Sequence, residues 1–158
     1  MNPRRLLCLA LLGWALVLAG CSSFNRDFKA ASPPAATAAR KADPFSGPWD
    51  GQWKSVDHKA AGGRLRCLFT RVDAAHYKAR FRANWLFFAS GYELTFQTKR
   101  RGDLLFFEGQ HDLGLLFGGV YRYQGRATPE HFSATYTSKY DDGSFEMKRP
   151  TQPRTRRD

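Results

Sequence analysis

The sequence lacks the short motifs that mark the common classes of enzyme. It contains no Gly-x-Ser-x-Gly, no Gly-x-x-x-x-Gly-Lys and no His-Glu-x-x-His. Its four histidines show no His-x-x-x-His or comparable spacing, and a divalent ion needs ligands that converge. These absences predict a protein that is not an enzyme, with no catalytic residue, no metal and no other cofactor.

Long apolar runs and helical periodicity are also scarce. The first apolar run, Leu6 to Leu18, would extend roughly 20 Å as a helix, which is short of a ~30 Å bilayer core. Arg4 and Arg5 precede it, as in the basic head of a signal peptide. Elsewhere no segment carries a helical period long enough for a crossover between parallel strands.

A cysteine follows this run in the sequence Leu18-Ala19-Gly20-Cys21. This segment resembles the lipobox of bacterial lipoproteins. The resemblance implies cleavage before Cys21, a diacylglycerol thioether on its sulfur and a further acyl chain, such as palmitate, on its new amino group. Ser22 is not the Asp that retains family members in an inner membrane, so we expect a lipid-anchored protein of the cell envelope, at the outer membrane. An ordinary secretory signal with a chance cysteine is the alternative.

The cysteines exclude an internal disulfide in the exported chain. Cys8 leaves with the signal peptide and Cys21 carries lipid, so Cys67 remains alone. It alternates with Leu65 and Phe69, which predicts a buried and inert thiol.

Composition divides the chain into four parts. Residues 1–20 are the signal peptide and residues 21–45 are the lipidated cysteine with a flexible tether, because prolines and small residues fill positions 32–39. Residues 46–150 are the folded domain and residues 151–158 are a basic tail. Lys and Arg number 25 against 14 Asp and Glu, giving a formal charge of +11.

The folded domain alternates apolar with polar residues, which is the spacing of β-strands. Eight antiparallel strands in sequential order close best into an up-and-down barrel, because closure removes the sheet edges. The alternative is an open β-sandwich. The strands are expected at residues 50–55, 64–72, 76–85, 91–99, 104–111, 119–127, 131–138 and 143–149.

The register of two hairpins can be predicted from the same pattern. Pairing Val72 with His76 brings Cys67 opposite Phe81, and pairing Asn84 with Gly91 brings Arg82 opposite Glu93. So many large side chains in so short a barrel should fill it. The inward set is Trp53, Leu65, Cys67, Phe69, Tyr77, Phe81, Tyr92, Leu94, Phe96, Phe107, Tyr121, Tyr123, Phe132, Tyr136, Phe145 and Met147.

Two short segments, Gly47-Pro48-Trp49 and Gly51-Gln52-Trp53, resemble the Gly-x-Trp that opens the first strand of lipocalins. The resemblance implies a lipocalin-like (calycin-like) barrel, with Trp53 closing its floor and a small apolar ligand as an alternative function. Residues 119–143 also resemble uncharacterised bacterial lipoproteins, a likeness that implies no activity.

Two loops that should share one end of the barrel are unusually apolar. They contain Trp85, Leu86, Phe87 and Phe88, and Leu115, Leu116 and Phe117. Exposed together they would form a large apolar rim, for a ligand, a membrane or a partner. The alternative is that both fold inward as a plug.

A cluster of polar residues at the same end has two interpretations. A metal or acid–base site could be drawn from Asp57, His58, His111, Asp112, Asp141 and Asp142. Residues 141–143 are more simply explained as a tight turn.

A basic face is expected on the outside of the second and third strands, at Arg64, Arg66, Lys78, Arg80 and Arg82. It would attract anionic lipid or lipopolysaccharide, or be merely solvated. Nucleic acid is not expected because the protein is exported, and the oligomeric state stays open. The sequence therefore predicts a membrane-anchored, non-catalytic binding or structural module of the envelope, whose partner is an anionic lipid or an envelope protein.

Overall fold

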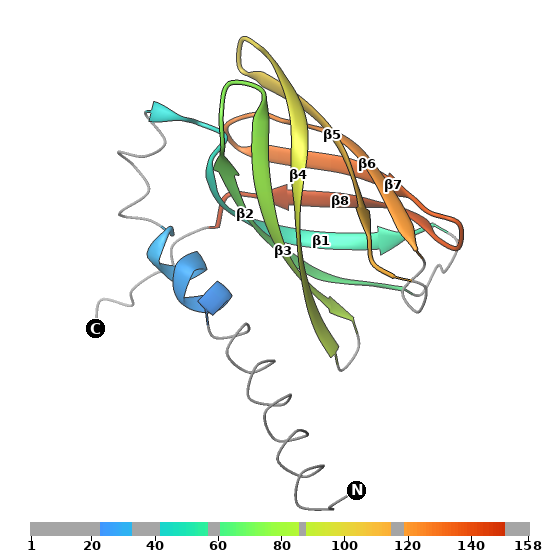
Figure 1. The fold of residues 1–158 in the computed structure, drawn as a ribbon. Coiled ribbons are helices and arrows are strands. Elements are labelled where there is room, and N and C mark those ends of the chain that lie inside the picture. The colour runs from blue at the N-terminus through green and yellow to red at the C-terminus, as the bar shows by residue number, and fades with distance from the viewer. Residues whose placement is uncertain (1–22, 33–41, 57–60, 86–87, 115–118, 151–158) are drawn as a thin grey trace, which may run out of the picture.

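The chain folds into a single closed β-barrel (Figure 1). The computed structural model describes residues 23–32, 42–56, 61–85, 88–114 and 119–150. Neighbouring strands are antiparallel and follow chain order, and β1 pairs with β8 to close the sheet. The strands are β1 (Gly47–Ser55), β2 (Gly62–Arg71), β3 (His76–Trp85), β4 (Phe88–Arg101), β5 (Leu104–Asp112), β6 (Val120–Ala127), β7 (His131–Thr137) and β8 (Asp142–Lys148).

The eight-stranded up-and-down barrel confirms the predicted fold class and excludes the open sandwich. The β2–β3 register is also as predicted, with Cys67 opposite Phe81 and Phe69 opposite Ala79. Inward residues alternate with outward ones on every strand, since strand side chains have a period of two. All sixteen residues of the predicted inward set belong to the core or pack against it.

The predicted register of β3 and β4 is wrong by two residues. Asn84 pairs with Ala89 and Arg82 with Gly91, so Glu93 stands opposite Arg80 instead of Arg82. The strands continue to the pair Trp85–Phe88, because only residues 86 and 87 separate them. This shift decides which arginine is paired with the carboxylate on the outer wall.

The floor of the barrel is sealed by the segment that precedes β1. Phe45 is fully buried beneath the core, and its backbone carbonyl accepts a hydrogen bond from the indole nitrogen of Trp49 at 3.1 Å. The carboxylate of Asp43 accepts hydrogen bonds from the Phe45 backbone N–H at 3.2 Å and from the Tyr77 hydroxyl at 2.9 Å. The resemblance to lipocalins pointed to Trp53 for the floor, but the structure places Trp49 there.

Aromatic rings fill the lumen from the floor upward. Phe107 stacks on Phe132 with centroids 4.6 Å apart, and Phe96 lies 4.8 Å from Phe107 and 6.3 Å from Tyr123. Gly125 gives these rings room, because a Cβ there would lie 2.4 Å from the ring of Phe107. The lower and middle lumen is therefore a packed core, as the size of the inward residues predicted.

Part of the predicted tether is ordered. Residues 23–30 form a helix that packs on the outside of the barrel beside β2 and β3. Phe24 and Phe28 are 6% and 8% exposed and cover Leu68, an outward residue of β2. Among the described residues, no helix is long and apolar enough to cross a membrane.

Candidate functional site at the mouth of the barrel

The end of the barrel opposite the floor carries aromatic side chains that the core does not fully cover. This end is formed by the last residues of β1, β3, β5 and β7 and the first of β2, β4, β6 and β8, so their connecting loops meet there. Trp53, Tyr92 and Tyr121 pack against the core and remain partly exposed. We refer to these three residues, with His111, as the mouth rings.

Four rings at this end form a ladder of nearly parallel planes. His111 lies over Tyr92 with centroids 5.7 Å apart, and Tyr92 lies 6.4 Å from Tyr123. Tyr121 continues the ladder at 6.3 Å from Tyr123. The three interplanar angles are 21° or 22°. Parallel faces of this kind suit a flat aromatic ligand, which gains most from offset stacking.

The ladder crosses the place where β4 and β5 stop pairing. Their hydrogen-bonded register runs from Arg101–Leu104 to Gln97–Glu108, so it includes no residue of the first half of β4. The stacked rings of Tyr92 and His111 join the two strands above this point. Beside the mouth, β4 and β5 are therefore held together by contacts between side chains and not by paired backbone.

The carboxylate of Asp141 lies beside hydroxyl groups at the mouth. Asp141 accepts a hydrogen bond from the Tyr136 hydroxyl at 2.9 Å and another from the Ser55 hydroxyl. Burial, followed by the hydrogen bond to Asp141, raises the pKa of Tyr136. The phenol therefore stays protonated at neutral pH, and the carboxylate supplies the negative charge of this corner.

Burial also raises the pKa values of Tyr92 and Tyr123, whose ring centroids lie 6.4 Å apart. All three phenols are thus neutral donors and acceptors over the physiological range. The mouth combines flat aromatic faces with hydroxyl groups and the Asp141 carboxylate, which suits a neutral or positively charged ligand.

Four of the six residues of the predicted polar cluster are described, and these four do not converge on a metal site. Asp57 and His58 lie outside the described residues. His111 points into the ring ladder, Asp112 accepts the Gly114 backbone N–H at 2.8 Å, and Asp142 accepts that of Ser138 at 3.3 Å. Among the described residues, no three His, Cys, Asp or Glu side chains gather as metal ligands would. The turn itself runs from Ser138 to Asp141, where the Ser138 N–H bonds to the Asp141 carbonyl, whereas Asp142 and Gly143 are the first residues of β8, so the expected turn at residues 141–143 lies one to three residues too late in the chain.

The two apolar loops predicted as a rim fall largely outside the described part of the chain. Leu86, Phe87, Leu115, Leu116 and Phe117 are not described, and Trp85 and Phe88 are placed only as the last pair of the β3–β4 ladder. Leu113 is half-buried at the start of the second loop. The described aromatic surface at this end belongs to strand residues that point inward.

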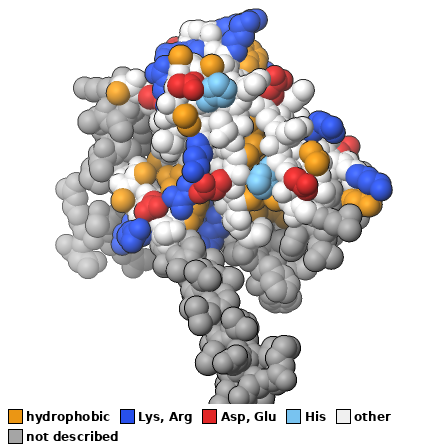
Figure 2. Space-filling model, in the orientation of Figure 1, with side chains coloured by type: hydrophobic (Ala, Val, Ile, Leu, Met, Phe, Trp, Pro, Cys, Tyr) orange, Lys and Arg blue, Asp and Glu red, His pale blue; other side chains and the backbone are white. Residues whose placement is uncertain are grey.

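The predicted basic face is present, and most of its cations have partners within the protein. Arg64 bonds to Asp50 through Nε at 2.9 Å, Lys78 to Glu93 at 2.6 Å, and Arg80 to both Glu93 and Asp27 at 2.9 Å. In Figure 2, blue side chains on this side of the molecule stand beside red ones. Arg66 lies over the rings of Phe24 and Phe28, and Arg82 is the residue opposite it in the β2–β3 pairing.

The remaining site predictions concern the cysteines. Cys67 is a fully buried free thiol inside the barrel, and burial raises its pKa well above the usual value. Its predicted inertness therefore has a physical basis, because the thiolate is the reactive form. Cys21, the predicted lipid attachment site, lies outside the described residues.

Sequence reasoning missed one feature of the site, at His111, and one of the floor, at Arg149. His111 was considered as a metal ligand, but the structure uses its ring as the outer step of the ladder. Arg149 was missed altogether, although it is 8% exposed and lies over Trp49 in the floor. Both residues could have been predicted to point inward, because His111 continues the inward alternation of β5 and Arg149 continues that of β8.

Comparison with known proteins adds a likeness of fold. The chain is similar to a de novo designed fluorescence-activating β-barrel, with 18% identity and a TM-score of 0.50 over 69% of this chain and 96% of that one. It also aligns with a variant of the fluorescent protein UnaG, with 11% identity and a TM-score of 0.41 over 70% of this chain and 99% of that one. No protein-family model and no curated protein sequence matches. At such identities the first likeness shows a small antiparallel barrel and nothing about the ligand.

Proposed function

We propose that this protein is an exported lipoprotein, anchored through Cys21, whose barrel is a non-catalytic binding module for a small flat ligand. The observation that carries the proposal is the ladder of nearly parallel rings at the mouth, from His111 through Tyr92 and Tyr123 to Tyr121. Its outer members keep part of their surface exposed while the rest of the lumen is packed. We place the ligand on these rings and not deep in the barrel.

The packed lumen argues against a long-chain ligand. A fatty acid would have to displace rings such as Phe96, Phe81 and Phe145, which are 5% exposed or less and lie within ring contact of one another. Protein cores are close-packed, so opening a channel of that length costs many contacts. A short planar molecule at the mouth needs no such rearrangement.

The electrostatics of the mouth favour a neutral or cationic ligand. Asp141 is the acid nearest the tyrosine hydroxyls, through its bond to Tyr136, and the buried phenols resist ionisation. A cation over the tyrosine faces would gain a further attraction from the rings. An anionic headgroup would be repelled by the carboxylate of Asp141.

Binding of anionic lipid or lipopolysaccharide through the basic face has less support. Arg64, Lys78 and Arg80 already contact carboxylates of the protein, so an external anion would compete with partners at 2.6–2.9 Å. A protein partner of the envelope is an alternative occupant of the mouth.

The ligand proposal can be tested with dyes of known charge. Mature chain carrying Cys21→Ser is titrated with thioflavin T, a flat cation, and with cis-parinaric acid, a fatty acid. We expect saturable binding of thioflavin T, weakened about five- to tenfold by Tyr121→Ala because a stacked ring is lost. Phe106→Ala, which removes an aromatic ring 38% exposed outside the barrel, is the matched control and should bind like wild type.

Two outcomes would contradict the ligand proposal. The first is thioflavin T binding that Tyr121→Ala and Phe106→Ala weaken equally, or no binding at all. The second is saturable binding of cis-parinaric acid that is lost in Tyr121→Trp, which would support a lipocalin-like carrier with an apolar lumen.

The anchor is tested separately in cells. Labelled palmitate should enter the wild-type protein and not Cys21→Ser, and the wild type should sediment with the outer-membrane fraction. An unlabelled protein released into the medium would overturn the anchor and leave the ligand proposal standing.

A further inference from the structure

The helix of residues 23–30 is fixed to the barrel by both apolar and charged contacts. Phe24 and Phe28 stack with centroids 5.7 Å apart and bury Leu68 on the outer wall. The guanidinium of Arg66 lies 5.5 Å and 5.3 Å from the two ring centroids. The helix is too short to be stable alone, so these contacts hold it in place.

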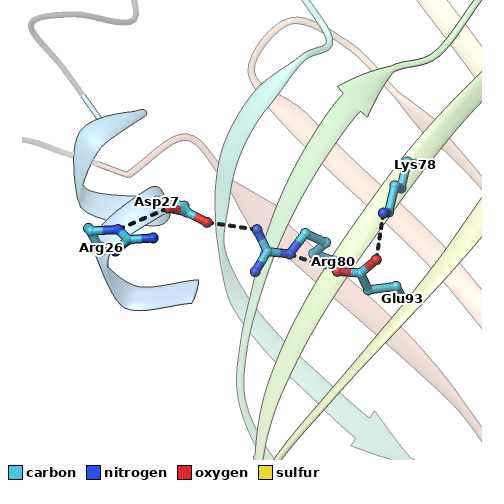
Figure 3. A network of polar contacts seen from close by, with 5 residues as sticks. All are labelled: Arg26, Asp27, Lys78, Arg80 and Glu93. Atoms are coloured by element: carbon cyan, nitrogen blue, oxygen red, sulfur yellow. Dashed lines mark hydrogen bonds and ion pairs between the residues drawn. The ribbon is translucent and has the colours of Figure 1, made fainter. Parts of the chain in front are cut away.

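A line of alternating charges extends the contact across β3 to β4 (Figure 3). Asp27 lies between Arg26, at 3.5 Å, and Arg80, at 2.9 Å. Arg80 reaches Glu93 at 2.9 Å, and Glu93 reaches Lys78 at 2.6 Å. The hydrogen bond from Arg80 is the main cause that lowers the pKa of Asp27, so the carboxylate remains charged at neutral pH.

The face of the helix that points away from the barrel is cationic. Asn25, Arg26, Lys29 and Ala30 are exposed, and the Arg26 side chain is 78% exposed. The helix begins two residues after Cys21, a distance that extended chain covers in about 7 Å. A lipid on Cys21 would therefore place Arg26 and Lys29 next to the headgroups, where cations are favoured.

We infer that the docked helix holds the barrel side-on against the membrane, with Arg26 and Lys29 of the helix contacting an anionic phospholipid surface, β2 and β3 behind the helix on that side, and β6 and β7 facing away. This inference rests on the proposed lipid anchor at Cys21. A disordered linker of residues 22–43 would let the barrel move through roughly 25 Å as a coil. Docking removes that freedom, because the wall of the barrel is attached to the chain within a few residues of the lipid.

The orientation can be measured by fluorescence quenching. Cys67 is buried and Cys21 is lipidated, so single cysteines introduced at Asn25, Thr70 and Thr135 can be labelled selectively. Thr70 is exposed on β2 and Thr135 is exposed on β7, on the far wall. The lipidated protein is placed in phosphatidylglycerol–phosphatidylcholine vesicles that carry a headgroup quencher.

We expect labels at Asn25→Cys and Thr70→Cys to be quenched at least twofold more than the label at Thr135→Cys. The double substitution Phe24→Ala/Phe28→Ala should undock the helix and make Thr70 and Thr135 equal, while Asn25 stays quenched. Arg26→Glu/Lys29→Glu keeps Phe24, Phe28 and Asp27, which contact the barrel, and should reduce the difference between Thr70 and Thr135 in anionic vesicles.

The outcomes separate the orientation from the anchor. Quenching at Asn25 with equal signals at Thr70 and Thr135 in the wild type would overturn the side-on orientation and leave the anchor intact. A protein that leaves the vesicles, with no quenching at any position, would overturn the anchor and this inference with it. A difference that survives the Phe24→Ala/Phe28→Ala substitution would show that the helix does not set the orientation.

Discussion

The guanidinium of Arg149 lies over the indole of Trp49, with its central carbon 3.7 Å from the ring centroid. The same side chain donates hydrogen bonds to the carbonyls of Pro129 at 2.9 Å and Pro48 at 3.2 Å, and to that of Pro44. One residue after β8 thus connects the segment before β1, β1 itself and the β6–β7 loop. These contacts make Arg149 the central residue of the floor.

Replacing this arginine should destabilise the barrel strongly. Arg149→Ala removes a buried cation–π contact and leaves three carbonyls to find other donors, so we expect a loss of about 2–4 kcal/mol in the free energy of unfolding. Arg149→Lys should recover little of the lost stability, because an ammonium group cannot reproduce the planar arrangement of donors in a guanidinium. Urea unfolding measures the effect, with exposed Arg122→Ala as the control, expected within about 0.5 kcal/mol of wild type. Equal losses in the two alanine variants would contradict this role.

The buried tyrosines should make stability fall at high pH. Burial is the main cause that raises the pKa values of Tyr77, Tyr92, Tyr123 and Tyr136 in the folded protein. In the unfolded chain these phenols lose their protons near pH 10, while the folded protein retains them. The stabilisation is therefore complete below about pH 10 and is lost as pH rises above it, because the unfolded state then binds fewer protons.

This pH dependence can be measured as urea midpoints between about pH 8 and about pH 11. Tyr136→Phe should show a shallower decline than wild type, since it removes one of the four titrating groups. Identical slopes for the two proteins would contradict the assignment. The absorbance of tyrosinate in the folded protein gives a second test, because the buried phenols should ionise only when the barrel unfolds.

Gly125, which lies against the ring of Phe107, should not tolerate a methyl group. A Cβ at Gly125 would lie 2.4 Å from both the Phe107 ring and the Ser133 carbonyl oxygen. We expect Gly125→Ala to lower the free energy of unfolding by about 1–3 kcal/mol through overpacking, measured by urea denaturation. Gly91→Ala is the matched control, because its Cβ would meet only the Phe81 carbonyl at 3.4 Å. A larger loss of unfolding free energy in Gly91→Ala than in Gly125→Ala would show that the lumen around Gly125 is not tightly packed.

The Cys67 thiol should be protected from reagents. In a Cys21→Ser protein made without its signal peptide, Cys67 is the remaining thiol, and it is fully buried with a raised pKa. A disulfide reagent should modify it only at the rate of unfolding, and fully in denaturant. Rapid modification under native conditions would indicate that the core opens easily.

Alternation of side chains was enough to predict the closed barrel, and the turn at residues 73–75 was enough to predict the β2–β3 register. The β3–β4 register was not predictable in the same way. The residues between Trp85 and Gly91 offer no early turn signal, so the loop was expected to be longer than the two residues that the structure shows. The length of a loop sets every residue pair of the two strands that it joins. The two-residue error in the loop therefore made Arg82, and not Arg80, the expected partner of Glu93.

The helix at residues 23–30 shows a different limit. Phe24 and Phe28 are four residues apart, which is the spacing of one helical face. Eight residues carry too little helical propensity to form a helix on their own. The partner surface, Leu68 with Arg66 and Arg80, becomes visible only once the β2 and β3 walls are assembled. Tyr92, Tyr121 and Tyr123 were predicted as inward residues and His111 was not, and the parallel arrangement of the four rings depends on the twist of the sheet.

The seal under the floor changes where the folding unit begins. A protein truncated to start at Gly47 would keep all eight strands and lose both Phe45 and the carboxylate of Asp43. The aromatic rings at the floor of the lumen would then be exposed to water. This newly exposed apolar surface would favour aggregation. The minimal autonomous unit therefore extends upstream of the first strand, at least to Asp43.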